Sequence, residues 1–196
     1  FRRLTHCYQH ACAGTTGQEK IIVSIKPPPL PPEHLRDPGD AWVEGPDGKR
    51  YWGRFGAAGL VALHPPLGIL LQLRAEWSHH GGTWGIPGGA LKMGEEPIAA
   101  ALREAGEEAG VPEGAIDVLE TSRLDLGFWS YTTVIGVAGA FFEPTPIDAE
   151  SVALEWVPID AVQDRELHPA FGDGWPDLRA RLHAYLRSGH RLDLDD

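Results

Sequence analysis

The stretch GALKMGEEPIAAALREAGEEAGV, residues 89–111, decides the fold because it predicts a helix that carries three glutamates within five residues. Pro97 suits the first helical turn, where its missing N–H would have no intrahelical partner. Gly110 followed by Pro112 predicts the end of the helix. Like charges one turn apart repel each other, and an interior glycine costs about 1 kcal/mol relative to alanine. Such a helix needs a reason to hold its carboxylates together.

This helix has two distinct faces when successive residues are placed about 100° apart. The glutamates follow the spacing i, i+3 and i+4 and therefore form one patch: Glu104, Glu107 and Glu108. The apolar residues form a separate stripe, which we expect to be buried: Ile98, Leu102, Ala105 and Ala109.

The carboxylate patch follows the segment IPGG, residues 86–89, whose glycines allow backbone carbonyls to approach a ligand. An isolated triplet of glutamates is more often a solvated acidic helix face. Beside this segment, three carboxylates and a carbonyl oxygen make the hard oxygen site that Mg²⁺ or Mn²⁺ prefers. A divalent cation would also remove the repulsion among the carboxylates, so the sequence predicts a metal site on this helix.

The composition predicts a globular protein rather than a disordered, nucleic-acid-binding or membrane-binding one. The chain has 196 residues, 42% of them hydrophobic, and a formal net charge of −11. General binding to nucleic acid or membranes needs basic patches, and no apolar run approaches the roughly 20 residues that span a bilayer. The two cysteines, Cys7 and Cys12, do not indicate a disulfide framework, and a reducing cytoplasm fits them. The oligomeric state stays open.

The chain divides into a tail, a lead-in segment, one folded domain and a second tail. Residues 1–40 are expected to be a tail that ends in a proline-rich linker, extended or disordered. Residues 41–55 lead into the domain at 56–190, and residues 191–196 follow it. A zinc site in the first tail is disfavoured, because four ligands within seven residues do not easily surround a tetrahedral ion: His6, Cys7, His10 and Cys12.

The remaining segments predict a mixed sheet covered by helices, because strands and helices occur without regular alternation. Strands are expected at residues 57–65, 68–75, 115–127, 129–142 and 151–159, with the third and fourth forming an antiparallel pair. The glycine-rich segment 78–89, which follows the second of these strands, is expected to be a loop. Helices are expected at 160–167 and 175–189, the second burying Leu178, Leu182 and Tyr185 or Leu186.

Residues 89–111 resemble the Nudix box, GX5EX7REUXEEXGU, in which U is an apolar residue. The match holds at every specified position: Gly89, then Glu95, then REAGEEAGV at 103–111. The resemblance implies an α+β fold, an α/β/α sandwich in which the box forms a loop–helix–loop on a mixed sheet. It also implies an enzyme that uses Mg²⁺ or Mn²⁺ to hydrolyse the pyrophosphate linkage of a nucleoside diphosphate joined to a further group X.

The resemblance also implies roles for the residues of the box. Glu107 and Glu108 are expected to be the principal metal ligands, and Glu104 a further ligand or the base that orients water. The carbonyl of Gly89 is expected to complete the metal shell. Arg103 is expected to hold a glutamate in place by a charge-assisted pair rather than to touch metal.

A fourth carboxylate from outside the box often joins the metal site in MutT-like members of this family. Glu150 has the corresponding spacing, six residues before Trp156, and Asp148 competes with it. Glu95 is expected to be structural and electrostatic. The sequence leaves open which of the two acids joins the site and how many metal ions it holds.

Four residues outside the box are candidates for substrate binding. Arg74 ends a strand, and a guanidinium is suited to bidentate contact with phosphate. His80 lies in the glycine-rich loop and could meet the substrate. Two aromatic residues of a later strand could stack on a base: Trp129 and Tyr131.

The substrate class is open at this stage, although a small-molecule nucleotide is implied. The preferred interpretation is a MutT-like (deoxy)nucleoside triphosphate pyrophosphohydrolase that releases a monophosphate and pyrophosphate. The alternative within the family is a pyrophosphatase for ADP-ribose, another sugar nucleotide or a dinucleotide. An alternative of another class is a non-catalytic nucleotide sensor, which normally adds a DNA-binding helix and often loses box glutamates. An isopentenyl diphosphate isomerase needs a core cysteine and is disfavoured.

Overall fold

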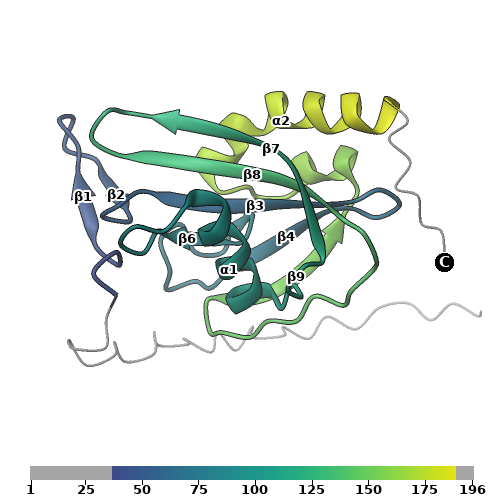
Figure 1. Ribbon diagram of the computed structural model, residues 1–196, viewed down its shortest axis with the longest axis horizontal. Helices are drawn as coiled ribbons and strands as arrows, with labels where there is room; N and C mark the ends of the chain where they lie inside the picture. Colours follow the sequence, from purple (N-terminus) through teal and green to yellow (C-terminus); the bar gives the residue numbers. More distant parts are fainter. Residues whose placement is uncertain (1–36, 189–196) are drawn as a thin grey trace, which may run out of the picture.

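The computed structural model describes residues 37–188. The tail up to residue 36, with the disfavoured zinc ligands, lies outside the described residues, as do residues 189–196. Helices cover both faces of one mixed sheet, and a small hairpin lies at one end (Figure 1). This arrangement is the α+β sandwich that the sequence predicts. Among residues 37–188, no helix combines the length and apolarity needed to cross a membrane.

The described elements run in this order. The strands are β1 (Trp42–Glu44), β2 (Arg50–Trp52), β3 (Ala57–His64), β4 (Gly68–Arg74), β5 (Trp84–Gly85), β6 (Gly88–Ala90), β7 (Ile116–Asp125), β8 (Ser130–Ala138) and β9 (Ser151–Val157). The helices are α1 (Pro97–Ala109), the 3-10 helix η2 (Ile159–Asp164) and α2 (Pro169–Arg187).

The main sheet has seven strands and mixed direction. Its central path is β5-β4-β3-β8-β7, with β6 paired to β3 and β9 paired to β4. The β3–β8 pair is parallel, and the β3–β4, β3–β6, β4–β5, β4–β9 and β7–β8 pairs are antiparallel. The antiparallel pairing of β7 with β8 confirms the predicted pair. The chain thus brings β6, the C-terminal half of α1 and the start of β9 to one region.

Successive residues of the central strands face opposite sides of the sheet, so two apolar cores form. On one face, Leu60 of β3 and Leu70 of β4 pack with the alanines of α1. On the other face, Val61 of β3 and Leu71 of β4 pack with α2 and η2. Strands β3 and β4 are buried on both sides, which explains why their sequences are continuous apolar runs.

Helix α1 begins and ends where the sequence predicts. Pro97 is the first helical residue, and Gly110 ends the helix with a left-handed φ of 67°. The predicted buried stripe is wrong at one residue, because Ile98 is 40% exposed. Compared with the predicted stripe, the buried side of α1 lies closer to the glutamates, because the small side chains of its alanines let the helix pack close to the sheet. The buried residues of the helix are Ala100, Ala101, Ala105, Glu108 and Ala109.

Helix α2 is longer than predicted. The sequence suggested a start at Trp175, next to a proline, but the helix starts at Pro169 and carries Pro176 in its interior. Leu178 and Leu182 are buried as expected. Of the two residues proposed to continue that face, Tyr185 packs against the core and Leu186 is exposed.

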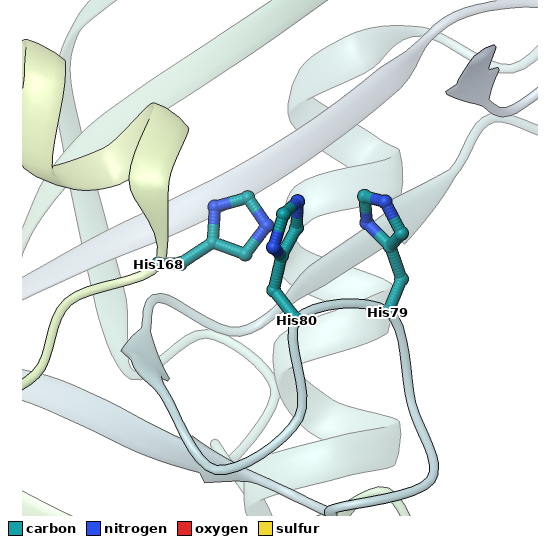
Figure 2. A group of neighbouring side chains, drawn as sticks. All are labelled: His79, His80 and His168. Carbon is teal, nitrogen blue, oxygen red and sulfur yellow. The ribbon is translucent and has the colours of Figure 1, made fainter. Parts of the chain in front are cut away.

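The glycine-rich segment predicted as a loop contains the two short strands β5 and β6. The turn between β4 and β5 carries His79 and His80, and it lies beside His168, the residue that precedes α2 (Figure 2). Main-chain hydrogen bonds between Trp84 and the 166–168 segment hold these two parts of the chain together. The predicted helix at 160–167 is the shorter 3-10 helix η2.

Candidate active site

A cavity of about 660 Å³ lies between α1, β6 and the loop before β9. Seven carboxylates line it: Asp37, Asp40, Glu104, Glu107, Glu108, Asp148 and Glu150. Three cations line it as well: Arg74, Lys92 and Arg103. The fold thus brings the box glutamates, the two candidate acids before β9 and Arg74 to one cavity. A second hollow of about 490 Å³, between β7 and α2, has only Glu120 and Arg181 as charged lining residues.

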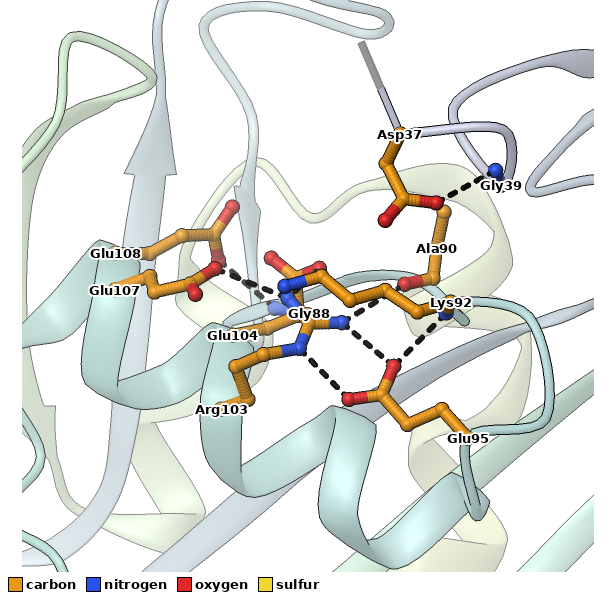
Figure 3. Close-up of polar contacts among 10 residues, drawn as sticks. All are labelled: Asp37, Gly39, Gly88, Ala90, Lys92, Glu95, Arg103, Glu104, Glu107 and Glu108. Atoms are coloured by element: carbon orange, nitrogen blue, oxygen red, sulfur yellow. Dashed lines mark hydrogen bonds and ion pairs between the residues drawn. The ribbon is translucent and has the colours of Figure 1, made fainter. Parts of the chain in front are cut away.

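Arg103 connects the acids of the box with one another (Figure 3). Its Nε donates to Glu95 Oε1 at 2.8 Å and its Nη2 to Glu95 Oε2 at 2.9 Å, a bidentate pair. Its Nη1 donates to Glu104 Oε1 at 2.8 Å and to Glu107 Oε2 at 3.0 Å. The hydrogen bonds from Arg103 lower the pKa of Glu95. Arg103 therefore fixes two of the three patch carboxylates from the side.

Glu108 is the buried member of the patch, with 5% of its surface exposed. The Gly88 amide donates to its Oε2 at 2.9 Å. Burial raises the pKa of Glu108 to about 8, and the negative charges of Glu104, Asp148 and Glu150 add to the rise. In the absence of a cation, a carboxylate here is held at a cost in free energy.

Glu104 lies against the backbone of β6. Burial raises its pKa, although hydrogen bonding to Arg103 works in the opposite direction. A Cβ atom at Gly89 would lie 2.6 Å from the carboxyl carbon of Glu104. A side chain at this position would therefore displace the Glu104 carboxylate, which gives the first glycine of the box a steric reason.

Glu150 and Asp148 occupy different situations in the loop before β9. Asp148 Oδ1 accepts hydrogen bonds from the amides of Glu150, at 3.0 Å, and of Ser151, at 3.2 Å. Asp148 therefore caps the turn that starts the strand. Within residues 37–188 the Glu150 carboxylate has no hydrogen-bond partner, and burial followed by the charge of Asp148 raises its pKa. Of the two, Glu150 has the freer carboxylate.

The donor set of this cavity fits a divalent cation of the Mg²⁺ type. Hard oxygen ligands converge there from α1 and from the loop before β9, next to the backbone of β6. Burial raises the pKa values of Glu104, Glu108 and Glu150. A bound cation would favour their charged forms and offset that cost. The arrangement explains why the helix tolerates its carboxylates.

The four candidate substrate residues lie in different places. Arg74 lines the cavity, and its Nε donates to the His79 carbonyl at 3.1 Å. The other three are not among the lining residues. Trp129 donates its indole N–H to the carbonyls of Trp52, at 3.0 Å, and Gly53, at 3.1 Å, and so ties the β1–β2 hairpin to the sheet.

Tyr131 and His80 also lie outside the lining. Burial, followed by the charge of Glu108, raises the pKa of Tyr131, whose hydroxyl lies over Gly59. His80 lies in the turn between β4 and β5, beside His79 and His168.

The two acids that precede β1 were missed by the sequence-based prediction, which placed residues 1–40 in a tail. Asp37 and Asp40 line the cavity, and burial followed by the charge of Asp37 raises the pKa of Asp40. The turn is anchored because the Arg54 amide donates to the Gly39 carbonyl at 2.9 Å. The sequence DPGD signals a turn, but no local pattern shows where that turn packs.

A buried chain of hydrogen bonds behind the cavity was also missed. Gln72 Nε2 donates to Ser151 Oγ at 2.8 Å, and Ser151 Oγ donates to the Glu108 main-chain carbonyl at 3.1 Å. These bonds join β4, β9 and the last turn of α1. They fix the end of the helix that carries Glu108 relative to the loop that carries Glu150.

Comparisons with known proteins show which family this chain resembles. The model of the NUDIX domain family matches residues 53–176. A "putative 8-oxo-dGTP diphosphatase 3" of Mycobacterium tuberculosis is 44% identical over 162 residues, which cover 78% of this chain and 74% of that protein. A "nucleoside triphosphate pyrophosphatase/Nudix hydrolase fusion protein" of Bifidobacterium longum is 46% identical over 162 residues. That match covers 78% of this chain but only 34% of the fusion protein.

A solved structure shows the same fold. The crystal structure of RenU, a Nudix hydrolase from M. smegmatis, superposes with a TM-score of 0.67 at 43% sequence identity. The match covers 74% of this chain and 96% of that one.

Proposed function

The chain belongs to the Nudix family of hydrolases, and from that premise we propose that it is a MutT-type nucleoside triphosphate pyrophosphohydrolase. The products would be a nucleoside monophosphate and pyrophosphate, with 8-oxo-dGTP as the first substrate to test. The observation that carries the proposal is the convergence of seven carboxylates, with Glu108 buried among them, and Arg74 on one cavity. The substrate rests on the 44% identity to a protein named as a putative 8-oxo-dGTP diphosphatase.

Nudix hydrolases generally use divalent metal ions, and we propose Mg²⁺ or Mn²⁺ for this chain. Four glutamates would hold it together with the carbonyl of Gly89: Glu104, Glu107, Glu108 and Glu150. When bound, the cation would neutralise phosphate charge and make water more acidic. Without it, a substrate with several negative charges would meet seven carboxylates in the cavity.

The residues around the proposed metal site would orient the reactants. Arg103 would keep Glu104 and Glu107 in place through its hydrogen bonds rather than contact the substrate. Arg74 would bind phosphate, because it lines the cavity and, among residues 37–188, its guanidinium donates only to the His79 carbonyl through Nε. Such fixed charges stabilise a phosphoryl-transfer transition state without reorganisation.

Hydrolysis needs one water, one broken bond and one proton acceptor. The water oxygen forms a bond to phosphorus, and the anhydride P–O bond between the α and β phosphates breaks. The water proton passes to a nearby carboxylate, and Glu104, as the further ligand or the base that orients water, would be that acceptor. Attack at the α or at the β phosphorus gives the same products, and water labelled with ¹⁸O would distinguish the two.

A product assay across a nucleotide panel tests this proposal. The panel contains 8-oxo-dGTP, dGTP, ADP-ribose and diadenosine polyphosphates, each with Mg²⁺ and with Mn²⁺. We expect 8-oxo-dGTP to give 8-oxo-dGMP and pyrophosphate with the highest kcat/KM. The exposed acid Glu113 offers a matched control, since Glu113→Gln should leave turnover unchanged while Glu107→Gln lowers it.

Other outcomes of that assay would replace the proposal. A preference for ADP-ribose or a dinucleotide would make the chain a pyrophosphatase for a capped nucleotide. Tight nucleotide binding without turnover on any substrate would make it a sensor. The cytoplasmic location inferred from the cysteines stays a prediction, which fractionation of the source cells would test.

A further inference from the structure

Three histidines meet beside the cavity, apart from the carboxylates (Figure 2). His79 and His80 come from the turn between β4 and β5, and His168 comes from the residue before α2. One ring nitrogen from each can be chosen so that all three lie within 4.8 Å of one another. The ring centroids are 4.1 Å apart for His79 and His80 and 4.7 Å apart for His80 and His168.

The backbone holds these three side chains in position. His80 has a φ of 54°, and it is the one non-glycine residue with positive φ among residues 37–188. A β-carbon in this region is unfavourable, so its persistence indicates that the turn is strongly constrained. Thr83 Oγ1 donates to the His80 carbonyl at 2.6 Å, and Arg74 Nε donates to the His79 carbonyl at 3.1 Å.

The third histidine is anchored from the other side. The His168 amide donates to the Trp84 carbonyl at 2.8 Å, so the residue before α2 is tied to β5. The side chain of His168 makes no capping hydrogen bond to α2. Two segments about 90 residues apart in sequence thus present imidazoles to one point, and the His79 ring also packs edge-on against Trp42 at 5.1 Å between centroids.

We propose that His79, His80 and His168 form a binding site for a transition-metal ion that prefers imidazole ligands, with Zn²⁺ as the first candidate. Three imidazoles with an open fourth position are a ligand set that tetrahedral Zn²⁺ accepts. Zn–N bonds of about 2.1 Å place nitrogens about 3.4 Å apart. The side chains of His79 and His80 are exposed, so closing the distance from the present 4.8 Å limit requires their rotation rather than repacking of a buried side chain.

The electrostatics of the cluster favour the neutral imidazoles that a metal needs. Burial lowers the pKa of His168 to about 4, and the charge of His80 adds to the effect. Burial, followed by the charge of His80, also lowers the pKa of His79. Arg50 and Arg74 bring positive charge to His79 and oppose a cation there. Selectivity over Mg²⁺ follows from the ligands, since Mg²⁺ prefers carboxylate and water oxygens.

This site does not depend on the proposed function, and its test does not use turnover. The full chain, with millimolar Mg²⁺ present to fill the carboxylate site, is titrated with Co²⁺ and followed by visible absorption. We expect the bands of tetrahedral Co²⁺, and we expect Zn²⁺ to displace them at stoichiometric amounts. His80→Ala and His168→Ala should each weaken Co²⁺ binding by at least about tenfold.

His183→Gln supplies the matched control, because His183 lies within α2, the helix that follows His168, and pairs with Asp160 instead of joining the cluster. It should retain the absorption of the wild type. Metal bound through the N-terminal histidines and cysteines would persist equally in all three variants, so only the difference between them reports on the cluster. Circular dichroism of each metal-free variant checks that it is folded. Equal Co²⁺ affinity in folded His80→Ala, His168→Ala and wild type would overturn the proposal.

Discussion

Replacing Glu108 with glutamine should stabilise the protein at alkaline pH when metal is removed with EDTA. The same substitution should remove the activity that is measured with Mg²⁺. The glutamine keeps the shape of the side chain and an oxygen that accepts the hydrogen bond from the Gly88 amide. It removes a buried charge whose folded-state pKa is raised to about 8 from an ordinary 4.5. Between those two values the folded wild type holds a proton that the unfolded chain has released. The free energy of unfolding of the wild type therefore falls as pH rises through this window.

The magnitude follows from the same two values. At about 1.4 kcal/mol for each pKa unit, the difference between 4.5 and about 8 corresponds to about 5 kcal/mol as an upper limit. Between pH 6 and pH 9 the loss through Glu108 should be about 2 to 3 kcal/mol. Glu104 and Glu150 have raised pKa values too, but they are present in both proteins. The difference between wild type and variant therefore isolates Glu108.

Urea unfolding in EDTA at several pH values from 6 to 9 would measure this effect. The stability of the wild type should fall with pH more steeply than that of Glu108→Gln. Glu113→Gln is the matched control, because Glu113 is exposed and does not line the cavity, so its replacement should leave the slope unchanged. Addition of Mg²⁺ should stabilise the wild type and narrow the gap. Parallel pH profiles for wild type and Glu108→Gln would refute the burial argument.

Three further predictions follow from single contacts. Gly89→Ala should lower kcat and weaken Mg²⁺ binding, because its Cβ would meet the Glu104 carboxyl carbon at 2.6 Å. Gly106→Ala has its nearest neighbour at 3.5 Å, so it should keep turnover and raise the free energy of unfolding by about 0.5 to 1 kcal/mol. Normal kcat in Gly89→Ala together with lowered kcat in Gly106→Ala would contradict both expectations. Arg103→Lys should lower kcat about tenfold or more in a steady-state assay, because lysine cannot hold Glu95 bidentately, and unchanged kcat would show that the pair is dispensable. Removal of residues 1–36 should leave turnover and Tm unchanged, whereas removal through residue 41 should lower both, because the Gly53 amide donates to the Ala41 carbonyl and Asp40 lines the cavity; equal behaviour of the two truncated proteins would contradict this.

Local sequence signals predicted the fold wherever a single segment determines its own structure. Pro97 and Gly110 fixed the ends of α1, and the family and fold predictions are confirmed. The prediction of the buried side of α1 was partly wrong, because it assigned the large apolar residues Ile98 and Leu102 to the buried face in preference to further alanines. Ile98 is exposed in the first turn of the helix, and Glu108 is buried because the side of the helix that faces the sheet includes it.

Contacts between distant segments could not be predicted from local patterns. The positions of Asp40 in the cavity and of His168 beside His80 depend on how turns pack after the sheet has formed. The spacing before Trp156 favoured Glu150 and left Asp148 as a competitor, and only the hydrogen bonds of the turn show that Asp148 caps it. The roles of these residues in catalysis stay predictions.

The most direct test of the proposed active site is a ³¹P NMR time course of 8-oxo-dGTP with Mg²⁺, run with wild type and with Glu108→Gln. We expect the wild type to give 8-oxo-dGMP and pyrophosphate. The folded variant should be slower by at least about 100-fold, or about 2.7 kcal/mol of transition-state stabilisation. Orthophosphate and the diphosphate as the first products would contradict the proposed cleavage. Turnover of the variant at the wild-type rate would contradict the assignment of the carboxylate cavity as the active site.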